Sequence, residues 1–460
     1  MAPLSKAGAA LAALREDLVG AVFAPGDPGY DEARGVFNAV IDRRPAVIAQ
    51  CADATDVVRA VRFGRDLDLP IAVRGGGHGL AGAARGDGAL VVDLRRMHRV
   101  AVDPRAGAVR VGGGATMSHL DRATQPYGLA TTGGRASTTG VGGFVLGGGT
   151  GWLDRAFGLA ADNLLGVELV TADAERVRAN VDDNPELFWA LHGGGGNFGI
   201  ATALTLRLHE LPEFSLVLLM FRPRLGPEVI SAFREIVRAG PDEVGGAVLY
   251  QSGPPGRPTP PKSSDGPLCA AVLTYAGDAD ELRRLAAPVL ALPHEAKLAG
   301  DLPYADAQRV LDQPPGLRGH WSAECLSALP DDLVEVFCAR ADGMPGQAGS
   351  RQLLFPQGGA IAAGPREFPV PYRDAAWTVH PCARWEDPAD DERAVAWVRG
   401  VRSAVRPWST GAVCPNLIGD EGPERVRAAL GEGSTLRLEK VKRRFDPDNV
   451  FRFNHNIRPV

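Results

Sequence analysis

The sequence is poor in cysteine and lysine and has no surplus of positive charge. Its six cysteines are spread over 460 residues without a C-x-x-C pair, which argues against both a disulfide framework and a zinc site. Lysine supplies only five of the 50 basic residues, and the net charge is −5. A nucleic-acid-binding protein normally carries a basic surface. We therefore expect neither a metal ion nor a nucleic-acid partner.

Long apolar runs are also missing, and no stretch approaches the length of a transmembrane helix. The apolar stretch at residues 7–14 is short and is followed at once by Arg15, Glu16 and Asp17. This pattern is typical of an amphipathic helix rather than of a secretory signal. We expect a cytoplasmic protein with no membrane partner, and the sequence carries no signal for a particular oligomeric state.

The length of the chain indicates more than one domain, because 460 residues exceed the usual size of a single hydrophobic core. From about Leu211 the pattern changes from glycine-rich segments to long alternating strands, such as residues 214–222 and 267–275, with helices between them. Roughly the last fifty residues return to the earlier style. This alternation is typical of an α+β region that is built on an antiparallel sheet.

The stretch at residues 70–82 carries the first chemical signal. A strand at residues 45–50, a helix at 53–66 and a strand at 71–73 form a predicted βαβ unit. Its second strand ends in Arg74, three consecutive glycines and His78. Glycines allow positive φ angles and a close approach of the backbone, and successive N–H groups can bind an anion. A ligand that bears a phosphate is the natural prediction.

Two further glycine concentrations follow, at residues 133–151 and 192–199. Neither fits the dinucleotide fingerprint of a strand, a G-x-G-x-x-G turn and a downstream acid, nor the G-x-x-x-x-G-K-[ST] phosphate loop. We interpret the three loops as the lining of one long groove for an extended ligand that contains a pyrophosphate.

These motifs resemble the berberine-bridge-enzyme-like branch of the FAD-linked oxidases, in the superfamily of vanillyl-alcohol oxidase and p-cresol methylhydroxylase. The resemblance rests on residues 74–78, 140–143, 147–151, 162–163 and 446–457, and it spans nearly the whole chain. It implies an α+β protein whose two-part FAD-binding domain is formed by residues 1–206 and 412–460. An inserted substrate-binding domain, residues 207–411, would carry the antiparallel sheet.

The resemblance also implies that His78 holds FAD covalently through an 8α-histidyl bond. Such a tether removes dissociation and raises the reduction potential of the flavin. The remaining FAD contacts that it implies lie in four segments of the chain: Arg74, Gly75, Gly76, Gly77, Gly79 and Gly82; Gly134, Thr138, Thr139, Gly140, Gly143, Gly149 and Trp152; Gly199 and Ile200; and Asn454 and Asn456.

Two departures from the family pattern lie in the second glycine-rich segment. Ala136 stands where many relatives have a cysteine as a second flavin tether, so we expect no cysteinyl link. Thr139 occupies the position before Gly140 that controls oxygen access in relatives. A small polar residue leaves oxygen access open, and a threonine in a turn can equally serve as a local hydrogen-bonding group.

A third departure concerns the catalytic base. Relatives usually place a tyrosine in a Tyr-x-Asn element, and here that element is Cys414-Pro415-Asn416. A cysteine acts as a base only as a thiolate, which requires a depressed pKa. The polar side chains that we consider as catalytic residues are therefore Cys414, Asn416, Tyr250, His320, Glu324 and His380.

The resemblance implies an FAD-dependent oxidase that removes hydride from a hydroxyl- or amine-bearing organic molecule, such as a secondary metabolite. Dioxygen would be the acceptor and hydrogen peroxide the product. Two alternatives stay open at this point. One is an oxygenase of polyketide-like substrates that works through a flavin-N5-oxide, and the other is a redox-silent relative that binds or cyclises its substrate.

Overall fold

The computed structural model describes residues 6–80, 86–253, 267–345 and 348–460. The strands are β1 (Ala21–Phe23), β2 (Val47–Gln50), β3 (Ile71–Arg74), β4 (Leu90–Asp93), β5 (Val100–Asp103), β6 (Ala108–Gly112), β7 (Leu129–Ala130), β8 (Leu164–Val170), β9 (Arg176–Ala179), β10 (Ile200–Arg207), β11 (His209–Glu210), β12 (Ser215–Phe221), β13 (Val244–Gln251), β14 (Leu268–Tyr275), β15 (Ala296–Asp301), β16 (Arg318–Trp321), β17 (Glu324–Leu326), β18 (Arg351–Pro356) and β19 (Trp377–Trp385).

The α-helices lie between and beside these strands. They are α1 (Lys6–Asp17), α2 (Tyr30–Arg34), α3 (Ala54–Asp66), α4 (Met117–Thr124), α5 (Val141–Leu146), α6 (Asp154–Phe157), α7 (Pro185–Ala190), α8 (Gly226–Ala239), α9 (Ala279–Leu285), α10 (Ala287–Leu290), α11 (Tyr304–Ala307), α12 (Asp331–Arg340), α13 (Ala360–Ala363), α14 (Asp391–Val405), α15 (Pro423–Leu430) and α16 (Glu432–Phe445). The predicted α+β class is confirmed.

A four-stranded sheet carries the first glycine loop. Its strand order is β1-β2-β4-β3, and β2, β4 and β3 run parallel. The predicted βαβ unit therefore contains an inserted strand, because β4 lies between β2 and β3. Helix α3 begins after Asp53, whose carboxylate accepts hydrogen bonds from the N–H groups of Thr55 and Asp56. Its apolar face packs against the sheet through Val57 and Val61.

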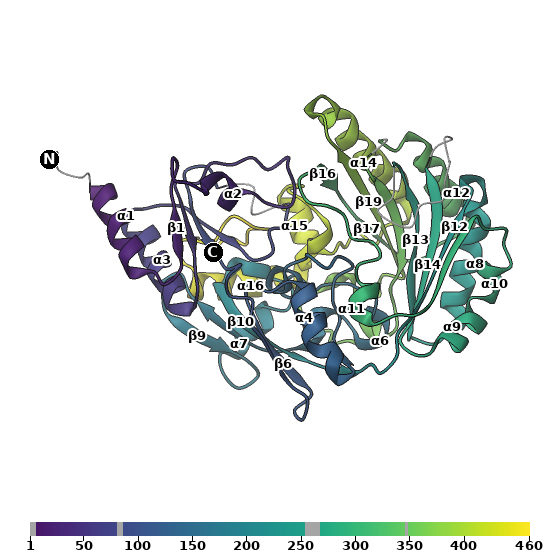
Figure 1. Cartoon of the computed structure of the whole chain (residues 1–460), viewed down its shortest axis with the longest axis horizontal. Coiled ribbons are helices and arrows are strands. Elements are labelled where there is room, and N and C mark those ends of the chain that lie inside the picture. The colour runs from purple at the N-terminus through teal and green to yellow at the C-terminus, as the bar shows by residue number, and fades with distance from the viewer. Residues whose placement is uncertain (1–5, 81–85, 254–266, 346–347) are drawn as a thin grey trace.

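A five-stranded antiparallel sheet, in the order β5-β6-β10-β8-β9, forms the second layer. Its core receives side chains from α5 and α7 and also from the C-terminal helix α16, through Leu438 and Val441. In Figure 1 the yellow C-terminal segment accordingly lies beside the purple and teal N-terminal elements. Chain segments that are far apart in the sequence therefore share one core.

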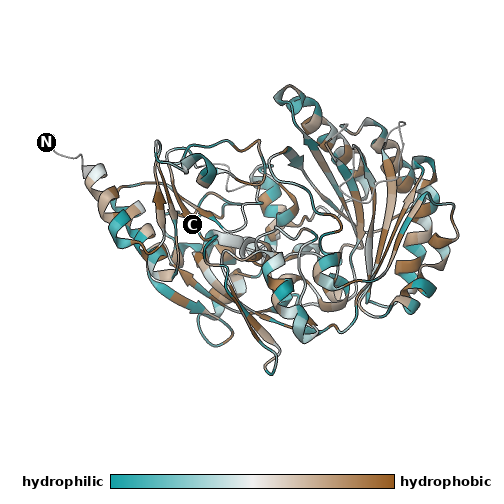
Figure 2. Ribbon diagram, viewed as in Figure 1, coloured by the Kyte–Doolittle hydropathy of each residue, from teal (hydrophilic) through white to brown (hydrophobic). Residues whose placement is uncertain are grey.

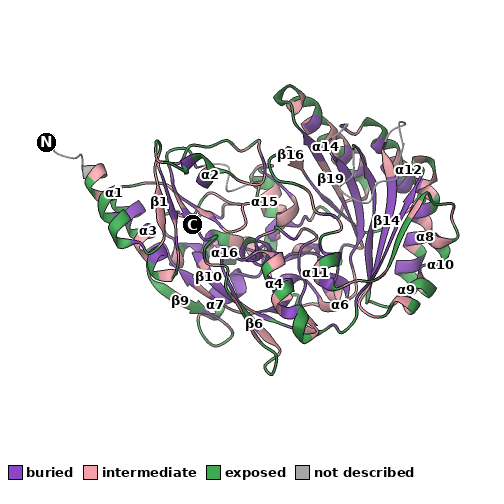
Figure 3. Cartoon of the chain, viewed as in Figure 1, coloured by how far each residue is buried: buried purple, intermediate pink, exposed green. Residues whose placement is uncertain are grey.

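The middle of the chain forms an eight-stranded antiparallel sheet in the order β15-β12-β14-β13-β18-β19-β16, with β17 also paired to β19. Helices α8, α12 and α14 cover one face, where Phe233, Phe337 and Val401 join the core. Figure 2 shows the apolar character of these strands, and Figure 3 shows that they are largely buried. The other face turns toward the glycine loops.

A buried ion pair ties the C-terminal segment to the third glycine loop. Lys442 lies 2.5 Å from a carboxylate oxygen of Asp446, and both side chains are fully buried. The same ammonium group donates to the carbonyls of Asn197 and Phe451, at 2.8 Å and 3.0 Å. Within the described residues, no helix is both long and apolar enough to cross a membrane.

Candidate functional site

One cavity of about 490 Å³ lies where the sheets meet. The volume falls within the range of small-molecule and cofactor sites. The three predicted glycine loops all contribute to its lining, at residues 74–79, 134–147 and 193–199. Strands β18 and β19 form the opposite wall, and the C-terminal part of the chain contributes residues between 415 and 418 and between 451 and 455. The predicted convergence of three separate loops on one groove therefore corresponds to this cavity.

Two of these loops touch backbone to backbone. A Cβ atom on Gly76 would lie 2.3 Å from the amide nitrogen of Gly140, and one on Gly140 would lie 2.3 Å from that of Gly76. No side chain fits at either position. Gly77 next to this contact has a φ angle of 72°, in the left-handed region that favours glycine. The contact thus requires the glycines that the sequence supplies.

Arg74 holds the base of the first loop. Its guanidinium lies 2.7 Å from a carboxylate oxygen of Asp93 and donates to the carbonyls of Gly35 and Ala33. Both members of this ion pair are buried. Arg74 lines the cavity, but its charge is balanced within the protein. We therefore assign it to the support of the loop.

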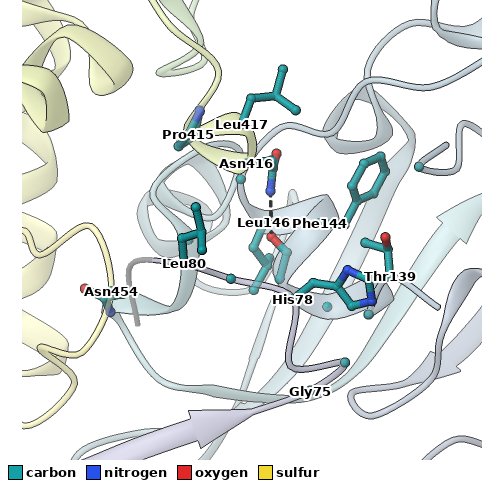
Figure 4. Close-up of a pocket in the computed structure, with 18 of the residues that line it drawn as sticks. Gly75, His78, Leu80, Thr139, Phe144, Leu146, Pro415, Asn416, Leu417 and Asn454 are labelled. Carbon is teal, nitrogen blue, oxygen red and sulfur yellow. Dashed lines mark hydrogen bonds between the residues drawn. The ribbon is translucent and has the colours of Figure 1, made fainter. Parts of the chain in front are cut away.

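His78 follows the loop and lies at the cavity, as Figure 4 shows. Two residues hold its ring. Its ring stacks on Phe37, with the ring centroids 4.1 Å apart and the planes at 20°. Its Nε2 atom lies 2.9 Å from Thr138 Oγ1, whereas Nδ1 has no hydrogen-bond partner within the described residues. Burial, together with the nearby charge of Arg384, lowers the pKa of His78 to about 4. The imidazole is therefore neutral at physiological pH.

Asn416 joins the C-terminal segment to the second glycine loop. Its side-chain amide donates to the carbonyl of Gly143 at 3.1 Å, and its oxygen accepts from the N–H of Gly149 at 3.0 Å. Figure 4 shows the side chain in this position between the two segments. Both ends of the amide are engaged by the backbone, so Asn416 positions the cavity wall.

Cys414 does not line the cavity. Its side chain is fully buried, and burial raises the pKa of the thiol to about 11. It is therefore a thiol at physiological pH, and its sulfur lies 3.7 Å from the Asn416 oxygen. The structure corrects the prediction of Cys414 as a base, because the group is neither ionised nor in reach of the cavity.

Three other predicted catalytic residues also lie outside the cavity. Tyr250 points to the helix-covered face of its sheet, where its hydroxyl donates to the carbonyl of Pro223 at 3.0 Å. Glu324 is buried and pairs with Arg425 at 3.0 Å. His320, on β16, is not among the lining residues. We therefore remove all three from the set of candidate bases.

His380 is the basic candidate that does line the cavity. Its Nδ1 lies 2.8 Å from the carbonyl oxygen of Ser322, so Nδ1 carries the proton and Nε2 keeps a lone pair. That Nε2 accepts from the thiol of Cys382 at 3.0 Å. Burial lowers the pKa of His380 to about 4 and raises that of Cys382 to about 12. The imidazole is neutral and has a lone pair available.

The predicted cofactor contacts divide into three groups. Gly75, Gly76, Gly77, Gly79, Gly134, Thr139, Gly140, Gly143, Gly199 and Asn454 line the cavity with Arg74 and His78. Gly149, Trp152, Ile200 and Asn456 are absent from the lining, as is Thr138, which reaches His78 instead. Gly82 lies outside the described residues.

Sequence reasoning missed three polar residues of the sheet wall. Cys382, Arg384 and Arg351 line the cavity together with His380. Residues 380, 382 and 384 share one face of β19, because side chains alternate along a strand. This period of two is the signal that could have found them once His380 had been considered.

Two sequence models of protein families match the chain. The model described as "FAD binding domain" matches residues 45–180, and the model described as "Berberine and berberine like" matches residues 418–458. The first match contains the loop with His78, and the second contains the C-terminal wall of the cavity. Both ends of the chain therefore carry the family signal.

Relatives match along the whole chain. The (R)-6-hydroxynicotine oxidase of Paenarthrobacter nicotinovorans is 29% identical over 96% of this chain and 97% of its own length. The uncharacterized FAD-linked oxidoreductase YgaK of Bacillus subtilis is 28% identical over 96% of this chain and 98% of its own.

Solved structures have the same fold. The 6-hydroxy-D-nicotine oxidase of Arthrobacter nicotinovorans superposes with a TM-score of 0.86, at 27% identity over 100% of this chain and 99% of its own. The BBE-like 1 protein of Physcomitrella patens has a TM-score of 0.87 at 22% identity, covering 98% of this chain and 99% of its own. The second likeness establishes the fold alone.

The cavity residues fit FAD. The glycine contact leaves the backbone open to a close ligand, and no aspartate or glutamate belongs to the described lining, as suits an anionic pyrophosphate. The side-chain oxygen of Asn454 is buried without a partner at the cavity wall. A buried polar atom of this kind normally has a partner, so it indicates a ligand group.

We expect Gly76→Ala to disrupt the site. The added methyl group would overlap the Gly140 backbone, and overpacking against other atoms typically costs ~1–3 kcal/mol of unfolding free energy. Denaturant unfolding and the ratio of flavin to protein absorbance measure both effects. The matched control is Gly79→Ala in the same loop, where the methyl group meets nothing within 4 Å, and its unfolding free energy should stay within ~0.5 kcal/mol of wild type. Equal stability of the two variants would contradict the packing argument.

Proposed function

We propose that this chain, which belongs to the berberine-bridge-enzyme-like family of FAD-linked oxidoreductases, oxidises a hydroxyl- or amine-bearing small molecule. Dioxygen is the final electron acceptor in this proposal, and hydrogen peroxide is the second product. The observation that carries it is the cavity in which the glycine loops face a wall of polar side chains from β18 and β19. Relatives named as a nicotine-derivative oxidase and a glucooligosaccharide oxidase are consistent with such a substrate range.

In this proposal one part of the chain binds FAD and another binds the substrate. Residues 1–206 and 412–460 form the FAD-binding part, and residues 207–411 form the substrate-binding part. Bound FAD supplies the two-electron acceptor for the substrate and returns the electrons to dioxygen. The backbone N–H groups of the loop at residues 75–79 bind the pyrophosphate, because such a nest favours anions.

We further propose that His78 carries the flavin through its Nδ1 atom. Nε2 is occupied by Thr138, which leaves Nδ1 as the nitrogen with a free position. The lowered pKa keeps the ring neutral, so the imidazole carries one proton, and in the tautomer whose Nε2–H donates to Thr138 Oγ1 the lone pair lies on Nδ1. Ala136 lines the cavity where a second tether would stand, so the histidyl bond is the single covalent link.

His380 is the proposed proton acceptor. The hydrogen bond from Nδ1 to Ser322 fixes the ring and directs the Nε2 lone pair toward Cys382 at the cavity wall. A substrate hydroxyl or amine that approaches this position can replace the thiol as the donor to Nε2. The substrate is then held with its reacting proton on the sheet wall and its reacting carbon toward the flavin side.

Anaerobic reduction tests the proposed function. We expect a hydroxyl- or amine-bearing substrate to bleach the flavin absorbance of the purified holoenzyme in the absence of oxygen. Readmitting air should restore the absorbance and give one hydrogen peroxide for each substrate consumed. A panel of alcohols, amines and hydroxy acids provides the candidates. Incorporation of isotopically labelled dioxygen into the product, without peroxide, would contradict the oxidase assignment.

Replacing His380 tests the proton acceptor. We expect His380→Gln to lower kcat/KM by ~10²–10⁴-fold, the usual contribution of a general base. The control is His320→Gln on the neighbouring strand β16, which lies outside the cavity and should leave kcat/KM unchanged.

The pH profile gives an independent readout. Because burial lowers the pKa of His380 to about 4, its lone pair persists as the pH falls, and the acid limb of kcat/KM should lie near pH 4. A limb near the ordinary histidine value of ~6.5 that persists in His380→Gln would show that another group is the base.

A further inference from the structure

Two buried arginines on the sheet wall have no carboxylate partner. Five arginines are buried in the described part of the chain. Three of them pair with acids, namely Arg74 with Asp93, Arg155 with Asp242 and Arg373 with Asp162. The other two, Arg351 and Arg384, form no ion pair with any described residue, and both line the cavity.

Arg351, on β18, is 7% exposed. Its Nε donates to the side-chain oxygen of Gln251 at 2.7 Å, and one terminal nitrogen donates to the carbonyl of Leu311 at 2.6 Å. The second terminal nitrogen has no partner within the described residues. Burial lowers the pKa of Arg351 to about 10, so the group is still positively charged at physiological pH. Its two hydrogen-bond partners are neutral, so no carboxylate of the described residues contacts the group directly.

Arg384, on β19, is 3% exposed. Its terminal nitrogens donate to the side chain of Gln313 at 3.0 Å and to the carbonyl of Pro314 at 2.7 Å. Its Nε is buried without a partner. The guanidinium carbon lies 5.0 Å from the centroid of the Phe37 ring, which stacks on His78. The second charge therefore lies close to the proposed flavin anchor.

The strand register places both arginines on the same face as His380. Arg351 is directly opposite Cys382, and Leu353 is opposite His380. Successive residues on one face of a strand are separated by ~7 Å and directly paired residues by ~5 Å. The Arg351 position is thus within ~9 Å of the proposed proton acceptor, a separation that a small molecule can span.

The lining offers nothing to neutralise these charges. No described lining residue is an aspartate or a glutamate, and Asp312, whose charge also acts on Arg351, accepts hydrogen bonds from the amide and hydroxyl of Ser137. A buried charge without a partner is costly to a folded protein. Both cations face the same space, and a single anionic group in that space would compensate them.

We propose that the substrate carries a carboxylate that binds between Arg351 and Arg384. The substrate class is therefore a carboxylate-bearing alcohol or amine, with the oxidised carbon placed toward His380 and the flavin. This inference rests on the proposed function and adds the substrate class to it. Arginine suits this task because its planar fork matches the geometry of a carboxylate.

Benzoate and benzyl alcohol provide a matched pair of probes, since both carry one aromatic ring and differ in the anionic group. They are titrated separately into the FAD-loaded holoenzyme, and binding is measured by calorimetry and by the shift of the flavin spectrum. We expect benzoate to bind at least ~10-fold more tightly than benzyl alcohol, because hydrogen bonds to a charged group are stronger than those to a neutral one.

Variants assign the effect to the two arginines. Arg351→Met and Arg384→Met should each weaken benzoate at least ~10-fold and leave benzyl alcohol unchanged, whereas Arg351→Lys and Arg384→Lys should retain part of the benzoate affinity. The control is Arg234→Met on α8. Its guanidinium donates to the carbonyl of Leu329 and pairs with Asp331, and it is absent from the cavity lining.

Several results would overturn the carboxylate site. Equal affinity for the two probes in wild type would do so, as would benzoate binding that survives in both methionine variants. A fall in flavin content in the lysine variants, with benzoate affinity unchanged, would assign the arginines to the cofactor instead. Benzoate has no alcohol or amine to oxidise, so its binding is read without turnover. A holoenzyme that binds benzoate but is bleached by no substrate would refute the oxidase proposal and leave the carboxylate site standing.

Discussion

The backbone contact between Gly76 and Gly140 is the constraint on which the rest of the site depends. It brings the loop after β3 against the segment before α5 with no room for a side chain, and it thereby sets His78 beside Thr138. Other interactions hold the remaining walls. The Arg74–Asp93 pair fixes the base of the first loop, and Lys442 ties the C-terminal segment to the third. Arg74 and Lys442 also donate to backbone carbonyls. Their charged groups are therefore engaged within the protein, and the inner surface of the cavity stays free for a ligand.

The two sides of the cavity follow different physical rules. The loop side presents backbone groups, whose direction depends on glycine conformations. The sheet side works through alternate side chains of β18 and β19, so each second residue can change without disturbing the core beneath. His380, Cys382 and Arg384 occupy three such positions. If the proposed function holds, the specificity of this chain lies in the sheet wall.

The loop side was predictable from the sequence, whereas of the polar residues on the sheet side only His380 was among the candidates. The clustered glycines next to His78 are a local signal, because such a run is needed where the backbone must adopt positive φ angles or approach another group closely. Tyr250 shows why the sequence could not single out His380 among the candidate bases. Every residue of β13 is buried, so alternation gives no indication of which face meets the cavity, and Tyr250 points to the helices. The prediction of Cys414 as a base was wrong for another reason. The residue occupies the expected place in the motif, but its burial depends on segments that are distant in the sequence. The insertion of β4 between β2 and β3 is likewise a long-range pairing that local patterns do not encode.

The central claim is that this cavity holds FAD through His78, and intact-mass measurement of the unfolded protein tests it most directly. Wild type and His78→Ala are each denatured, freed of unbound flavin and weighed. The account predicts that wild type is heavier than its sequence by one FAD, that the added mass maps to the peptide containing His78, and that His78→Ala has the mass of its sequence alone. Wild type at its sequence mass, or a flavin that stays attached in His78→Ala, would contradict it.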